Sequence, residues 1–218
     1  MMKIELKYGC NPNQKNAYLE SMGDMPVEVL NGRAGYINLM DALNGWQLVS
    51  ELKAATGMSA ASSFKHVSPA GAAVSVPLSD TERKMYFVSP SMDLSPLATA
   101  YIRARGADRM ASFGDFVSLS DVCDRCTASI ISKEVSYGVI APGYEPEALE
   151  ILKAKKGGSF LVLEIDPSYV PQTAEKHTVF GLDLVQDHNC WIPDASTFED
   201  IRSVEKSIPE SARLDMIV

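Results

Sequence analysis

The segment GVIAPGYEPEALEILKAKKGGSFLVLEI, residues 138–165, contains a strand, a helix and a second strand in succession. Residues 138–141 form a short apolar run that ends at Pro142-Gly143, which is typical of a buried strand followed by a turn. Residues 146–156 have helical spacing and stop at Gly157-Gly158, and residues 160–165 form another apolar run. This alternation predicts parallel strands covered by helices.

The same alternation extends toward the amino terminus. Ser95-Pro96 is typical of a helix start, with the proline in the first turn, and we expect Asn38 and Ser120-Asp121 to cap two further helices. We therefore expect a three-layer α/β/α fold with a mixed, mostly parallel sheet. The expected helices are 38–55, 95–105 and 120–135, the expected strands are 3–8, 27–30, 60–67 and 109–117 (broken at Gly114), and a turn begins at 69–71.

The chain changes character after residue 165. Prolines and scattered polar residues between 166 and 195 indicate extended chain, with one strand expected at 178–185. Residues 209–218 have the pattern of a helix that stops while it is still apolar. The sequence thus predicts an α/β lobe over 1–165, followed by an extended connecting segment and the start of a truncated helix over 166–218.

Composition narrows the class of protein. The 218 residues are 46% hydrophobic and carry a net charge of −8, which argues against a nucleic-acid-binding surface. No apolar run reaches the length of a membrane span, and the first residues lack the core of a signal peptide, so we expect a soluble, cytoplasmic protein. The four cysteines are too few and too unevenly spaced for a disulfide scaffold.

The run SFKHVSPAGAA, residues 63–73, places Lys65 beside His66 just before a series of small residues. A histidine is suited to accept a proton at neutral pH, and a neighbouring ammonium can stabilise developing negative charge. The alternative is a surface lysine beside a histidine that only bonds backbone. The residue types alone leave both interpretations open.

Several segments in a fixed order resemble the AICAR transformylase family, the folate-dependent formyl transferases of purine synthesis. The run at 63–73 closely matches the catalytic segment of that family. The likeness also covers KYGCNPNQ (7–14), LNGRAGYIN (30–38), DALNGWQLV (41–49), RARGADRM (103–110), SFGDF (112–116), IAPGY (140–144) and FGL (180–182). We identify the chain as a member of this family on these segments.

The resemblance implies a cytidine-deaminase-like fold and a set of site residues. By resemblance, His66 is the general base and Lys65 stabilises the transition state, while Lys7, Tyr8, Gly114 and the position of Tyr137 contact the nucleotide AICAR. The implied reaction transfers the formyl group of 10-formyltetrahydrofolate, a co-substrate, to the 5-amino group of AICAR on the route to IMP. An aromatic amine has little basicity, so its proton must leave as the new bond forms.

Four positions depart from the family pattern. Lys7 stands where the family has an arginine, so the charge is kept and bidentate geometry is lost. Asn13 replaces a histidine and Ser75 replaces a glycine. Tyr137 stands where the family has an aspartate, and a phenol cannot accept two hydroxyl protons as a carboxylate does.

The chain also stops about halfway through the usual transformylase domain. In the family, the missing half supplies further nucleotide contacts, most of the folate site and much of the dimer. Two hypotheses remain open: a transformylase lobe that carries Lys65 and His66, or a degenerate module that binds a nucleotide or dimerises without catalysis. Both predict a homodimer.

Other clusters favour ordinary structural roles. Cys123-Asp-Arg-Cys126 lacks the second pair that a structural zinc site needs, and we expect no metal. Arg103 and Arg105 fit the solvated carboxyl-terminal end of a helix better than an anion site.

Overall fold

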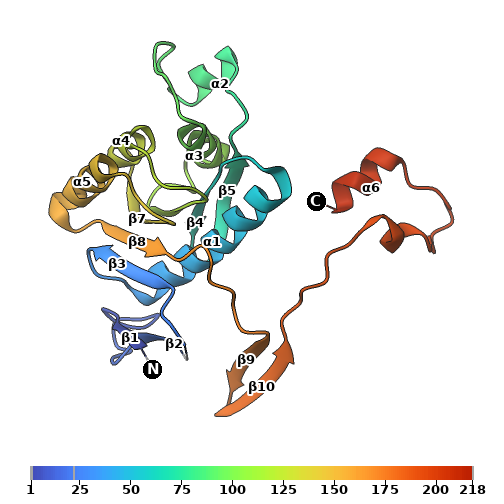
Figure 1. Cartoon of the computed structure of the whole chain (residues 1–218), viewed down its shortest axis with the longest axis horizontal. Coiled ribbons are helices and arrows are strands. Elements are labelled where there is room, and N and C mark those ends of the chain that lie inside the picture. Colours follow the sequence, from blue (N-terminus) through green and yellow to red (C-terminus); the bar gives the residue numbers. More distant parts are fainter. Residues whose placement is uncertain (1, 22, 218) are drawn as a thin grey trace. The chain divides into compact units, whose positions relative to one another are not determined.

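The computed structural model describes residues 2–21 and 23–217, which divide into a unit ending at Pro167 and a unit beginning at Ser168. Within the described residues of the first unit, six strands form one sheet in the order β3-β8-β7-β6-β4-β5 (Figure 1). These strands are β3 (Val27–Asn31), β4 (Ala60–Lys65), β5 (Ser68–Val74), β6 (Asp115–Leu119), β7 (Ser136–Ala141) and β8 (Leu161–Ile165).

The sheet is mixed. β6, β7 and β8 are parallel neighbours, whereas β3 pairs antiparallel with β8 and β4 pairs antiparallel with both β5 and β6. β5, β6, β7 and β8 therefore run in one direction, and β3 and β4 run in the other. The predicted mixed, mostly parallel sheet is confirmed in the orientation of its strands.

Helices cover both faces of the sheet (Figure 1). On one face, Leu39 and Ala42 of α1 (Tyr36–Thr56) pack with Phe116 and Ile140 of the strands. On the other face, the fully buried Tyr101 belongs to the cluster that unites the sheet with α3 (Pro96–Ala107), α4 (Arg125–Lys133) and α5 (Pro146–Ala154). Neighbouring residues of β6 and β7 belong to opposite clusters, as the twofold alternation of a strand requires. The three-layer α/β/α fold is therefore confirmed.

Smaller elements complete the first unit. β1 (Met2–Glu5) and β2 (Tyr18–Ser21) form a separate antiparallel pair, α2 (Asp80–Met85) precedes α3, and a 3₁₀ turn, η1 (Lys155–Gly158), follows α5. The Ser95 hydroxyl accepts the backbone N–H of Ala98 and Pro96 is in the first turn of α3, so the predicted start of this helix is confirmed. The predicted cap of α1 is wrong by three residues: the helix begins at Tyr36, and Asn38 accepts the N–H of Gly35.

The predicted starts of one strand and one helix are wrong, because the hydrogen bonds of nearby side chains place these starts elsewhere. The strand expected over 109–117 begins only at Asp115. In the preceding loop, the Ser112 carbonyl accepts a hydrogen bond from the buried Arg105 and takes no part in the strand pairing. The helix expected from Ser120-Asp121 begins at Arg125, because Asp124 is its cap. Ser120 instead accepts the N–H of Ala60, and Asp121 pairs with Lys53.

One predicted turn and one predicted strand also differ. The turn expected at 69–71 is part of β5, which tolerates Pro69 because it is an edge strand. The strand expected at 178–185 is a hairpin of β9 (Ala174–Val179) and β10 (Leu182–Asp187). Phe180 and Gly181 have φ angles of 52° and 77°, which are turn values that no strand residue adopts.

The second unit is built differently. It contains the β9–β10 hairpin, a 3₁₀ turn, η2 (Ala195–Phe198), and α6 (Glu210–Ile217). None of its described residues is buried. In the described parts of the chain, no helix combines the length and the apolar character needed to cross a membrane.

Candidate active site

Lys65 and His66 lie at a tight turn between β4 and β5. Lys65 pairs with Ser68, so His66 and Val67 alone connect the two strands. Both have left-handed backbone, with φ angles of 53° and 63°. Such two-residue hairpin loops favour Asn-Gly, and a β-branched residue at this φ is an outlier. Strained residues of this kind cost of order 1–3 kcal/mol each and cluster at functional sites.

The carboxylate of Asp41, on α1, contacts this turn. Its Oδ1 accepts the backbone N–H of Val67 at 2.6 Å. Asp41 is buried, whereas His66 is exposed. Burial raises the pKa of the Asp41 carboxyl above its usual value, although the backbone N–H groups of Val67 and His66 oppose this shift. The His66 side chain is therefore exposed to solvent, while the backbone of the turn is hydrogen-bonded to the buried Asp41.

Lys65 reaches across to the loop that precedes β6. Its Nζ donates to the backbone carbonyl of Phe113 at 2.6 Å. The next residue, Gly114, has a φ of 77°, and a Cβ placed on it would lie 3.2 Å from Cε2 of Tyr137. The structure therefore brings together three of the predicted site residues, Lys65, Gly114 and Tyr137, at the edge where β4 ends and where β6 and β7 begin.

Lys156 also lies at this edge. Its Nζ is 4.5 Å from the centre of the Tyr137 ring. Partial burial, followed by the nearby charge of Lys7, lowers the pKa of the Lys156 ammonium. Lys156 thus lies beside Tyr137 and is close enough to Lys7 for the two charges to interact. The predicted Tyr8 follows Lys7 and is 41% exposed.

Sequence reasoning assigned Lys156 to the end of a helix, where a cation is explained without a ligand. The available signal was the sequence KKGG, residues 155–158. In the structure, Lys156, Gly157 and Gly158 all have positive φ angles, and they turn the chain into β8. A lysine held in such a turn at the edge of a sheet differs from a lysine on an exposed helix.

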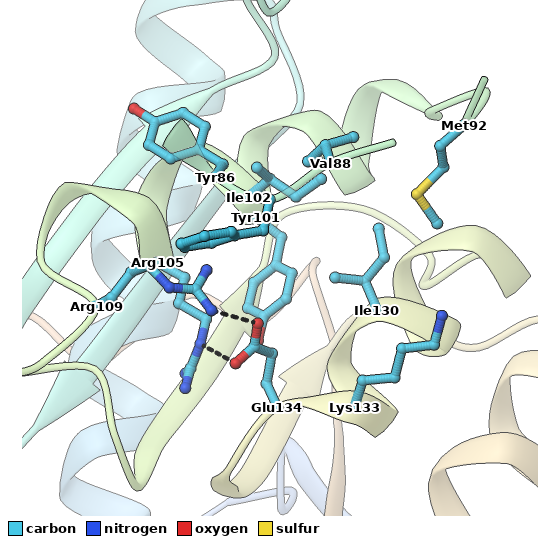
Figure 2. A pocket seen from close by; sticks show the side chains of 11 residues that line it. Tyr86, Val88, Met92, Tyr101, Ile102, Arg105, Arg109, Ile130, Lys133 and Glu134 are labelled. Carbon is cyan, nitrogen blue, oxygen red and sulfur yellow. Dashed lines mark hydrogen bonds and ion pairs between the residues drawn. The ribbon is translucent and has the colours of Figure 1, made fainter. Parts of the chain in front are cut away.

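Arg105 contacts the backbone just before β6 and β7, next to this edge. It is buried, contrary to the prediction of a solvated face, and its guanidinium pairs with Asp115 and with Glu134. It also donates to the carbonyls of Ser112 at 2.8 Å and Val135 at 3.3 Å. Figure 2 shows Glu134 between the guanidinium groups of Arg105 and Arg109. These contacts fix the two backbone segments that lead into Gly114 and Tyr137.

A cavity of about 150 Å³ lies on the other side of Arg105, between α3, α4 and the segment after α2 (Figure 2). Tyr86, Val88, Ile102 and Ile130 supply apolar parts of its wall. Lys65 and His66 do not line it. The cavity and the candidate site are thus separate places that share only the Arg105–Glu134 pair.

Cys123 and Cys126 lie at the start of α4. Cys123 is buried just before α4, and burial raises the pKa of its thiol. Cys126 lies in the first turn of α4. Over residues 2–21 and 23–217, no three His, Cys, Asp or Glu side chains are grouped so that they could hold a metal ion.

This arrangement has a definite chemical capacity. An exposed imidazole can exchange a proton with a bound molecule, and the neighbouring Lys65 ammonium is fixed by a carbonyl. The Lys156 ammonium beside Tyr137 can attract an anion, since a bound negative charge would favour the charged form that burial and Lys7 disfavour. The geometry fits an anionic substrate from which a proton is removed.

Comparisons with known proteins place the chain in a family. The family model described as "AICARFT/IMPCHase bienzyme" matches residues 1–218. A "Bifunctional purine biosynthesis protein PurH" of Cereibacter sphaeroides is 32% identical over 215 residues, which cover 96% of this chain and 36% of the relative. One of Leuconostoc citreum is 27% identical over 220 residues, which cover 98% of this chain and 38% of the relative.

The chain therefore spans well under half the length of these curated relatives. The match of the family model nevertheless covers both units of the structure. The chain belongs to the AICARFT/IMPCHase bienzyme family of purine biosynthesis.

Proposed function

We propose that this chain carries the transformylase site of the family, which transfers a formyl group from 10-formyltetrahydrofolate to the 5-amino group of AICAR. The observation that carries the proposal is the fixed Lys65 ammonium, 2.6 Å from the Phe113 carbonyl, next to an exposed histidine in a strained turn. Family membership supports the purine pathway as the setting.

Each residue then has a role that its surroundings permit. His66 accepts the proton that the aromatic amine loses as its nitrogen bonds to the formyl carbon. Lys65 faces the negative charge that develops on the formyl oxygen. The proton is then available to the folate nitrogen when its bond to the formyl carbon breaks. These steps need no redox partner.

The nucleotide is proposed to lie along the sheet edge. Lys7 and Lys156 are proposed to contact its phosphate, because an anion favours the charged form of the Lys156 ammonium beside Tyr137. Gly114 has a φ of 77°, which suits glycine, and the Tyr137 ring packs against it. The residues around Lys65 offer cations and a proton acceptor, which suit a nucleotide, and we assign none of them to the folate ring.

A second candidate function is favoured by Tyr137. Its ring lies against Gly114 on one side and under the Lys156 ammonium on the other. A phenol in this place occupies space beside the substrate and cannot accept two hydroxyl protons. The alternative is therefore a module that holds a nucleotide without transferring a formyl group.

Calorimetric titration separates these functions. The chain is titrated with AICAR and then with a folate analogue, beside a His66→Ala variant, and formyl transfer is assayed in parallel. Binding of both ligands, with transfer lost in His66→Ala, supports the enzyme. Binding of AICAR alone, on the order of micromolar affinity, supports the nucleotide-holding module. Binding of neither ligand contradicts both proposals.

We also propose that the chain associates with a second copy. Val170, Phe180, Ile192 and Val204 of the second unit are between 81% and 99% exposed, and apolar side chains this exposed favour coverage by another surface. Sedimentation equilibrium tests the homodimer, and a compact monomer at micromolar concentration contradicts it. A cytoplasmic location stays a prediction.

A further inference from the structure

The turn His66-Val67 is a costly way to join β4 and β5. Both residues have positive φ angles, which histidine adopts more often than most residues but which are a genuine outlier for the β-branched Val67. A two-residue loop with Asn-Gly would close the same hairpin without this strain. The strands themselves are already paired from Ala60↔Val74 to Lys65↔Ser68. Closing the hairpin therefore does not account for the choice of residues.

The buried carboxylate of Asp41 is costly for a separate reason. Burial raises the pKa of its carboxyl, which means that its ionised form is penalised in the folded protein. Its best contact is the Val67 N–H, at 2.6 Å, and the His66 N–H also favours its ionised form. Two successive N–H groups of a turn form a concave site for an anion, and here the anion comes from the protein.

The two costs are coupled through one hydrogen-bonded contact. Asp41 lies on α1, which packs on the sheet face that contains Phe116, so its position is set by the core and not by the turn. The turn joins β4, the strand that pairs with β6, to the edge strand β5. A fixed acceptor on α1 therefore holds the backbone of the turn against relaxation toward negative φ.

We infer that Asp41 is a positioning residue that holds the strained His66-Val67 turn and so fixes where the His66 imidazole stands. Asp41 acts through the backbone and touches no substrate. Its effect on formyl transfer rests on the proposed function, whereas its hold on the turn does not. A single hydrogen bond, from the Val67 N–H to Asp41, thus links α1 to the turn that carries the proposed base.

Three variants of the full chain test this inference. Asp41→Asn keeps an oxygen acceptor for the Val67 N–H, Asp41→Leu removes it, and Asp41→Leu with Val67→Gly also removes the strain at position 67. The readouts are hydrogen exchange of the residue-67 amide and the ¹H–¹³C resonances of the His66 ring. Asp121→Leu is the matched control, because it removes the partner of Lys53 at the other end of α1.

The expected result is specific to the turn. In Asp41→Leu, exchange of the Val67 amide accelerates by about tenfold or more relative to amides of β6, and the His66 resonances shift or broaden. In Asp41→Asn, exchange of the Val67 amide and the His66 resonances stay close to those of the unaltered chain. Adding Val67→Gly to Asp41→Leu returns the His66 resonances toward their original positions. Asp121→Leu changes overall stability without a selective change at residue 67.

The inference is overturned if Asp41→Leu leaves the Val67 amide and the His66 ring unchanged, or changes them only in proportion to global stability, as Asp121→Leu does. Calorimetry with AICAR on the same variants keeps the two proposals apart. A selective change at the turn in a chain that binds no AICAR contradicts the proposed function and supports the positioning role.

Discussion

At the residue scale, burial of the Asp41 carboxylate penalises its ionised form in the folded chain. Because the pKa of Asp41 is raised by burial, the folded chain binds its proton more readily than the unfolded chain does. The contribution of this group to stability therefore falls as pH rises from the unfolded pKa through the folded one. A neutral asparagine avoids that loss. We expect Asp41→Asn to be at least as stable as the unaltered chain at pH 7, with the advantage shrinking as pH falls through the folded pKa of Asp41.

Urea unfolding at several pH values measures this difference. The carboxylate accepts N–H groups of the turn and senses His66. The comparison is therefore repeated with His66→Gln in both backgrounds. A stability deficit of Asp41→Asn at neutral pH that disappears in acid would show that the ionised form is favoured by folding, contrary to the raised pKa.

Gly114 is a second residue whose substitution has a clear expected result. Alanine at its φ of 77° is strained, and its Cβ would press on Tyr137 at 3.2 Å. We expect Gly114→Ala to lose about 1–2 kcal/mol of stability and to weaken binding of AICAR. Gly57→Ala is the matched control, since Gly57 has a φ of 69° and no atom within 4 Å of an added Cβ. Equal losses of affinity for AICAR in the two variants would contradict the placement of Gly114 in the nucleotide site.

The residues of the site were predictable to different degrees. Lys65 and His66 are adjacent in sequence, so their chemistry could be predicted before their positions were known. Asp41 could not be predicted as a partner of the turn, because it lies inside a helical pattern and its contact joins residues 26 positions apart. Lys156 was missed for the same reason: its position beside Tyr137 depends on tertiary structure.

At the scale of elements, Arg105 ties α3 to the starts of β6 and β7. Removal of its guanidinium leaves Asp115, which is fully buried, without its cation. We expect Arg105→Met to cost about 3–5 kcal/mol, measured by denaturant unfolding. Arg103→Met is the control on the same helix, because Arg103 pairs with Glu82 nearer the surface and should cost far less. Similar costs for the two variants would contradict the assignment of Arg105 as the buried link.

The elements show why boundaries were harder to predict than types. The strands and helices over 138–165 were predicted because apolar runs and glycines define them locally. The start of β6 and the start of α4 were misplaced because Arg105 and Asp124 decide them, through contacts that are not visible in hydrophobic periodicity. The hairpin at 174–187 was merged into one strand because Phe180 does not look like a turn residue, although Gly181 after it does.

At the scale of the molecule, the two units differ in how they are stabilised. The first unit has two clusters of buried side chains, one on each face of the sheet. The described residues of the second unit include none that are buried, and an isolated two-stranded hairpin is at best marginally stable in water. The first unit supplies its own core, and the second does not.

This difference predicts a contrast in hydrogen exchange. In the monomeric chain, we expect amides of β6 and β7 to exchange slowly, through opening of the sheet, and amides of β9 and β10 to exchange almost as fast as unstructured peptide. Mass spectrometry of peptic fragments resolves the two regions. Raising the protein concentration is the second arm, because association with another copy would bury the exposed Phe180 and Leu182 and slow exchange in the hairpin. A hairpin that is already protected at the lowest concentration would mean that the second unit is stabilised within one chain, and the argument for a partner from its exposed apolar residues would fail.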